Sequence, residues 1–83
     1  MKLIAEKITL DSGKVISIDR FNTEDGKYQI EMNDVIPSRY NEHWHVNEHV
    51  KDDHPVWLRS FRTKASAMEY VKRLYQAEKL ASS

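Results

Sequence analysis

Apolar and polar residues alternate along the first third of the chain in the way that β-strands require. Residues 2–10 and 14–21 are rich in apolar and β-branched side chains. In residues 27–33 the alternation is regular, since every second residue from Tyr28 to Met32 is apolar and the residues between them are polar. A period of two places alternate side chains on opposite faces of a sheet. The pattern therefore predicts three strands.

Short turns separate these three stretches. The first turn contains Gly13, and the second contains the pair Asp25 and Gly26. Glycine accepts the positive φ that tight turns need, and aspartate followed by glycine is a strong hairpin signal. Two short connections between three strands predict an antiparallel meander, in which consecutive strands are neighbours.

The middle of the chain divides into a loop and a fourth strand. Residues 33–41 contain Pro37, which has no backbone N–H and cannot lie in a central strand, so a loop is expected here. In residues 43–50 apolar side chains occupy one parity, with Glu48 as the exception, and three histidines occupy the other. This period of two favours a strand over the alternative of a helix.

The last third completes the sheet and adds a helix. Residues 51–55 are expected to form a hairpin loop, and residues 56–62 a fifth strand. The fifth strand is apolar on both parities, which favours a more central place in the sheet. Residues 64–80 contain neither glycine nor proline and many good helix formers. Thr63 is the predicted N-cap of this helix.

The helix has an alternative start and one apolar face. A capping box of Ser66 and Glu69 would begin the helix three residues later than Thr63 does. The apolar side chains form one stripe, which consists of Ala67, Met68, Tyr70, Val71, Leu74 and Tyr75. This stripe must be buried, and the apolar face of residues 27–33 is available to it.

The sequence thus predicts an α+β fold: an antiparallel meander sheet of four to five strands with one C-terminal α-helix packed on one face. A chain of 83 residues is expected to form a single domain over residues 1–83. No apolar run reaches the ~18 residues of a membrane span, and residues 1–5 are too short for the core of a signal peptide. A cytoplasmic protein without membrane contact is expected.

Composition and charge exclude several classes of chemistry. The chain has no cysteine, which excludes disulfides, thiolate zinc sites and cysteine nucleophiles. Thirteen Lys and Arg balance thirteen Asp and Glu, but the charges are unevenly distributed. Residues 34–55 carry two cationic and five acidic side chains, a net charge of −3. Residues 56–83 carry six and two, a net charge of +4.

The four histidines lie close together in the acidic middle of the chain. His43, His45 and His49 share one strand face, and His54 follows in the loop with Asp52 and Asp53. Alternate histidines on a strand are about 7 Å apart, close enough to share a zinc ion, so a metal site is one hypothesis. The alternatives are a contact with a partner and a solvated strand face.

Histidines also titrate near neutral pH, since an unperturbed imidazole has a pKa of ~6.5. We therefore expect binding that uses this face to change between pH 7.5 and pH 5.5.

Two further groups could carry binding. Cationic side chains at the last strand and helix would contact phosphates if they share a surface; they are Arg59, Arg62, Lys64, Lys72 and Arg73. Trp44 and Trp57 lie on the two arms of the predicted last hairpin and are expected to pair across it, either in the core or as an aromatic patch. Together with the histidines they give the candidate partner-binding set: His43, Trp44, His45, His49 and Trp57.

Signatures of catalysis are missing from the sequence. Two glycines cannot form a glycine-rich phosphate loop, and a pairing of Ser60 with a histidine has no support from the spacing. We therefore expect a small non-enzymatic binding or regulatory protein that acts through a protein–protein interface. A nucleic-acid-binding domain is the first alternative, and a His-rich metal-binding protein is the second. Open sheet edges and zero net charge also predict a homodimer.

Overall fold

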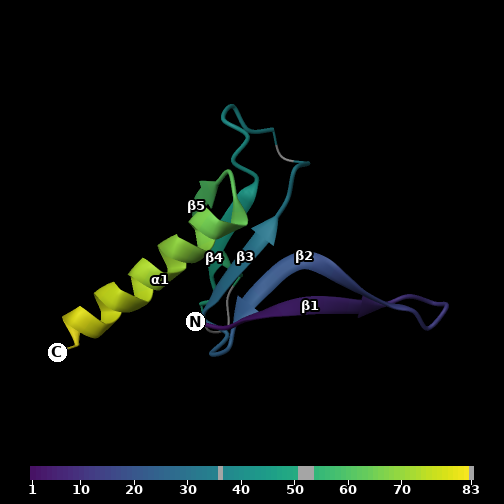
Figure 1. Cartoon of the computed structure of the whole chain (residues 1–83), viewed down its shortest axis with the longest axis horizontal. Helices are drawn as coiled ribbons and strands as arrows, with labels where there is room; N and C mark the ends of the chain where they lie inside the picture. The colour runs from purple at the N-terminus through teal and green to yellow at the C-terminus, as the bar shows by residue number, and fades with distance from the viewer. Residues whose placement is uncertain (36, 51–53, 83) are drawn as a thin grey trace.

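The computed structural model describes residues 1–35, 37–50 and 54–82 and has the predicted α+β fold. Five strands form one antiparallel sheet in the order β1-β2-β3-β4-β5, so the predicted meander is confirmed (Figure 1). A single helix follows the last strand. The elements are β1 (Leu3–Thr9), β2 (Val15–Thr23), β3 (Tyr28–Met32), β4 (Trp44–Glu48), β5 (Val56–Phe61) and α1 (Lys64–Ala81).

The two turns between the first three strands have the expected chemistry. Gly13 and Gly26 both adopt positive φ, 88° and 71°. A residue with a Cβ atom would be strained in this conformation. The carboxylate of Asp25 accepts hydrogen bonds from the Thr23 hydroxyl at 2.7 Å and from the backbone N–H of Lys27 at 2.9 Å. Because these bonds order the turn, β2 continues to Thr23, two residues past its predicted end.

The helix begins where its N-cap predicts. The Thr63 side chain accepts a hydrogen bond from the backbone N–H of Ser66 at 3.1 Å, and the helix starts at the next residue, Lys64. The alternative start three residues later is wrong, because Ser66 lies inside the first helical turn as the partner of this cap. At the other end the helix is fastened to β3, where the Tyr28 hydroxyl donates to Glu78 at 2.9 Å.

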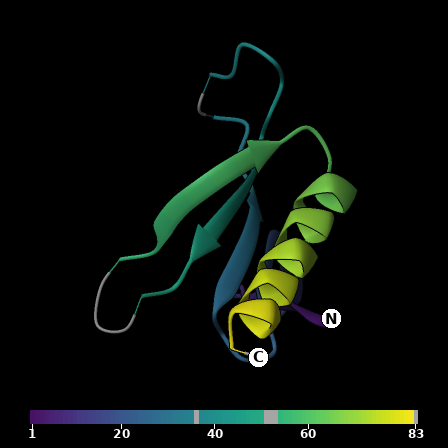
Figure 2. The same cartoon turned by 90° about the vertical axis from the view of Figure 1, so that its left-hand side faces the viewer.

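The core lies between the helix and one face of the last three strands. Figure 2 shows α1 running alongside this part of the sheet, and it packs on β3, β4 and β5. The fully or almost fully buried side chains come from both layers; they are Tyr28, Ile30, Val46, Ala67 and Val71. The predicted packing of the helical stripe on the apolar face of β3 is thus confirmed for Tyr28 and Ile30. This side of the sheet is called the covered face below.

The ends of the sheet differ from its middle. The hairpin of β1 and β2 extends away from the helix (Figure 1). The strand β5 forms the opposite edge, so the expectation that it is more central is wrong. Its apolar side chains have different surroundings. Leu58 and Phe61 pack against the core, whereas Val56 and Trp57 are exposed.

Candidate functional site

The face of the sheet opposite the helix is polar across its central strands. The register pairs Gln29 with Asn47, Glu31 with His45, and His45 with Ser60. These residues alternate with the apolar residues of the covered face, so the period of two places them on the opposite side. We call this side the uncovered face; its residues are Glu6, Arg20, Asn22, Gln29, Glu31, His45, Asn47, Trp57 and Ser60.

One half of the uncovered face is an ionic network that joins three strands. Arg20 donates to Glu31 at 2.7 Å and to Glu6 at 3.1 Å, and Asn22 donates to the second oxygen of Glu6 at 2.8 Å. The Asn22 hydrogen bond, helped by Arg20, holds the pKa of the Glu6 carboxyl below its usual range. The hydrogen bonds that Arg20 donates to Glu31 and Glu6 raise the pKa of Arg20. This network fixes the side chains of β1, β2 and β3 relative to one another.

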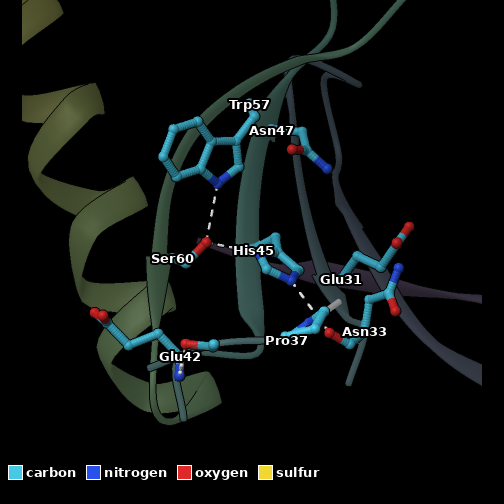
Figure 3. Close-up of a pocket in the computed structure, with 9 residues that line it drawn as sticks. Glu31, Asn33, Pro37, Glu42, His45, Asn47, Trp57 and Ser60 are labelled. Atoms are coloured by element: carbon cyan, nitrogen blue, oxygen red, sulfur yellow. Dashed lines mark hydrogen bonds between the residues drawn. The ribbon is translucent and has the colours of Figure 1, made fainter. Parts of the chain in front are cut away.

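The other half of the uncovered face is a chain of hydrogen bonds that ends at an exposed tryptophan (Figure 3). The indole N–H of Trp57 donates to Ser60 Oγ at 2.9 Å, and Ser60 Oγ lies 2.6 Å from Nδ1 of His45. The other ring nitrogen, Nε2, lies 3.2 Å from the carbonyl oxygen of Asn33. The chain therefore connects β5 through β4 to the residue that follows β3.

The carbonyl of Asn33 determines which ring nitrogen of His45 carries the proton in this series of hydrogen bonds. A carbonyl oxygen only accepts, so Nε2 of His45 carries a proton and donates to it. In the neutral imidazole Nδ1 is then the acceptor, and the Ser60 hydroxyl donates to it. Because Ser60 Oγ accepts from Trp57 at the same time, each polar group in the chain has a partner.

A hollow of about 500 Å³ lies beside this chain. Carboxylates, amides and hydroxyls line it together with the indole, and none of the described residues that line it is a lysine or arginine; they are Glu31, Asn33, Pro37, Ser38, Glu42, His45, Asn47, Trp57 and Ser60. Trp57 is 62% exposed, although its N–H is held by Ser60. The hollow therefore offers a positioned aromatic ring and a negative to neutral lining.

The two tryptophans do not pair, contrary to the expectation from the sequence. Trp44 lies opposite Phe61 and Trp57 lies opposite Asn47, so the rings occupy different faces of the sheet. Leu58 is the extra residue of a bulge in β5 and shifts the register by one residue. Trp44 packs at the edge of the core, stacked on Phe21 with 6.4 Å between ring centroids.

Of the three histidines predicted to share a strand face, only His45 lies within β4, which is shorter than predicted; His43 precedes the strand and His49 follows it. Their surroundings differ. His45 belongs to the hydrogen-bond chain described above. Nε2 of His49 lies 3.4 Å from the amide oxygen of Asn22, and Nδ1 of His43 is buried without a hydrogen-bond partner. Across residues 1–35, 37–50 and 54–82, no three side chains of the metal-binding types come together in a candidate site. The loop carboxylates considered as further ligands, Asp52 and Asp53, lie outside the described residues.

The five candidate phosphate-binding residues do not form one surface. Arg59 and Arg73 line a hollow of about 330 Å³ with the rings of Phe61 and Tyr70. Lys72 lines a different hollow, of about 520 Å³, which also contains Glu24 and Asp25. Of the remaining two, Lys64 stacks over Phe21, 3.6 Å from the ring centroid, and Arg62 donates to the carbonyl of Tyr40 at 2.9 Å.

The pairing of Ser60 with a histidine, which found no support in the spacing of the sequence, is present in the structure, where Ser60 Oγ lies 2.6 Å from His45 Nδ1. These residues are fifteen positions apart, and the register of β4 with β5 places them directly opposite each other. The alternation in residues 43–50 indicated that His45 would face away from the apolar side. The partner across the strand depends on the bulge at Leu58, and no local feature of the sequence predicts that bulge.

Three comparisons with known proteins found no match. No family model matches the chain, and no curated protein and no solved structure matches it either. Within the part of the chain that the structure describes, no helix has the length and hydropathy needed to cross a membrane.

Proposed function

We propose that this chain is a non-enzymatic binding protein that recognises a protein partner through the hollow beside Trp57. The observation that carries the proposal is an exposed indole whose position is fixed by a hydrogen bond to Ser60. Rigid aromatic side chains give large contact areas at a low cost in conformational entropy, and tryptophan is enriched among the residues that dominate binding energies. In this proposal the Ser60–His45 pair positions the indole.

The charge of the hollow supports a partner with a basic side chain. Among the described residues Glu31 and Glu42 line it, and no lysine or arginine does. Glu31 already bonds to Arg20 at 2.7 Å, so Glu42 is the carboxylate that would attract a cation most. An arginine or lysine side chain of the partner would lie over the face of Trp57 and near these carboxylates, which gives cation–π and electrostatic attraction. A phosphate would be repelled by the same groups. We therefore propose a partner segment that presents a basic side chain. We also propose that the protein acts in the cytoplasm.

Titration with two blocked tripeptides, Gly-Arg-Gly and Gly-Glu-Gly, tests this proposal by NMR. We expect the arginine peptide, and not the glutamate peptide, to shift the indole N–H signal of Trp57, while the indole signal of Trp44 in the core stays in place. In the wild type we also expect the arginine peptide to shift the signals of His45 and Ser60, and Trp57→Ala should remove these shifts. Tyr40→Ala is the matched control, because Tyr40 is also an exposed aromatic residue, at 55%.

Two results would contradict the proposal. The first is equal shifts with both peptides, which would show that charge does not select the ligand. The second is a Trp57→Ala variant that still responds to the arginine peptide as the wild type does. The predicted change of binding between pH 7.5 and pH 5.5 remains a prediction, and the triple change of His43, His45 and His49 to Gln tests it.

Nucleic-acid binding is a second candidate because of the hollow beside the helix. Arg59 and Arg73 face the same space as two aromatic rings, Phe61 and Tyr70, whose centroids are 5.3 Å apart. Guanidinium groups beside aromatic rings suit the phosphates and bases of single strands. If this candidate is right, affinity for a mixed-sequence single strand should fall steeply with salt, and charge reversal at Arg59 and Arg73 should abolish it.

A further inference from the structure

The two edge strands of the sheet differ in how they are protected. In β5 the extra residue of the bulge, Leu58, lies in the edge strand itself, and Pro55 precedes the strand. Bulges and prolines are the features that keep an edge strand from pairing with another chain. In β1 the irregularity lies in the neighbour: Ala5 pairs with Phe21 and Lys7 with Ser17, so the extra residues belong to β2. The edge of β1 is therefore continuous.

The hairpin that carries this edge also exposes apolar side chains. Ile4 is 52% exposed and Ile8 is 44% exposed, and both lie on the same face of β1. Across the hairpin Ile16 pairs with Ile8 on this face, whereas Val15, which is 56% exposed, pairs with Thr9 on the other face. Figure 1 shows the hairpin extending away from α1, which packs on β3, β4 and β5 instead. Apolar side chains that cluster on an open edge mark an interaction surface.

The charge of this hairpin fits a second copy of itself. Residues 1–19 contain three lysines, Lys2, Lys7 and Lys14, and three carboxylates, Glu6, Asp11 and Asp19. The segment is therefore neutral, as is the whole chain. Two copies meet without net repulsion, and an antiparallel pair of identical strands closes on itself about a twofold axis.

We propose that β1 pairs with β1 of a second copy in the antiparallel sense and joins the two sheets into one. The register that we propose places Ile4 opposite Ile8 of the second copy. The twofold axis repeats this contact, so the interface contains two Ile4–Ile8 pairs. Glu6 then lies opposite Glu6 of the second copy at the twofold axis. The hydrogen bonds from Arg20 and Asn22 in its own chain hold each carboxylate and offset the repulsion between the two. This interface is independent of the proposed function, because it uses the opposite end of the sheet from Trp57.

Sedimentation equilibrium tests the interface with a matched pair of variants. Ile8→Lys and Val56→Lys introduce the same charge into the two edge strands at residues of almost equal exposure, 44% and 46%. We expect the wild type to dimerise and Ile8→Lys to weaken the dimer by about tenfold or more, because each copy loses an apolar contact. Val56→Lys should leave the dimerisation constant unchanged, as should Trp57→Ala.

Three outcomes of this measurement overturn the proposal. One is a monomer of 9.8 kDa at high micromolar concentration, in which case any segment that pairs with β1 comes from a different protein. Another is an equal effect of Val56→Lys and Ile8→Lys. The third is a dimer that Ile8→Lys leaves intact. Failure of the peptide titration at Trp57 would not affect any of these results, so the two proposals fail separately.

A disulfide experiment tests the register, since the chain has no cysteine of its own. Residues directly opposite in an antiparallel pair have Cβ atoms about 5 Å apart, near the reach of a disulfide. We expect a mixture of Ile4→Cys and Ile8→Cys chains to oxidise mainly to the mixed dimer. A predominance of the two homodimers would contradict the register.

Discussion

The covered and uncovered faces of the sheet use the same central strands but are stabilised by different interactions. On the covered face Ile30 and Val46 are fully buried beneath α1. One residue away, Gln29 is 8% exposed and bonds to Asn22 and Asn47 at 3.3 Å each. The first face depends on removal of apolar surface from water, and the second on satisfied hydrogen bonds. The difference teaches that a single strand can contribute to the core with one residue and to a binding surface with the next.

The sharpest test of this difference compares two neighbouring residues. Ile30→Ala should lower the free energy of unfolding by about 3 kcal/mol, because it leaves a cavity in the small core. Gln29→Ala should lower it by about 1 kcal/mol, because it removes two long hydrogen bonds between neutral groups. Urea unfolding followed by circular dichroism measures both values. Equal costs would show that the two faces do not differ in the way proposed.

The covered face also depends on where the helix begins. Thr63→Ala removes the side chain that accepts from the N–H of Ser66, and we expect it to lower the free energy of unfolding by about 1 kcal/mol. Thr63→Ser keeps the accepting oxygen and is the control. A destabilisation that serine fails to restore would mean that the threonine methyl group, and not the cap, matters.

The ionic network should make a smaller contribution that salt can weaken. Arg20→Met keeps the apolar stem but removes the bonds to Glu6 and Glu31, and partly exposed pairs of this kind are worth at most about 1 kcal/mol. The cost should shrink in 1 M sodium chloride, where charges are screened. Arg73→Met, which removes the exposed pair with Glu69, should cost less. A cost for Arg20→Met that does not change with salt would show that packing is responsible.

Acid should affect the turn that joins β2 to β3. The hydrogen bonds from Thr23 and from the backbone of Lys27 lower the pKa of Asp25. Its stabilising contribution is therefore complete above the unfolded pKa of about 4 and is lost as the pH falls through the lower folded pKa. Asp25→Asn should reduce the dependence of the thermal midpoint on pH below 4, with Asp11→Asn as the control for removal of a turn carboxylate. An unchanged slope in Asp25→Asn would contradict this assignment.

The sequence determined the elements and their faces by local rules. Alternation set the parity of Tyr28 and Ile30, glycine marked the turns, and Thr63 marked the start of the helix. Each of these signals depends on residues a few positions apart, which is why the meander and the C-terminal helix could be predicted. The same parity indicated that His45 would lie on a polar face.

Only the tertiary structure decided which residues meet across that face. The bulge at Leu58 shifts the register of β5 by one residue, and beyond this bulge Ser60 lies opposite His45. The same pairing places Trp44 and Trp57 three residue pairs apart, on different faces of the sheet. Register is a property of two paired strands and of the packing on both sides of them, so a period of two in either strand alone does not contain it.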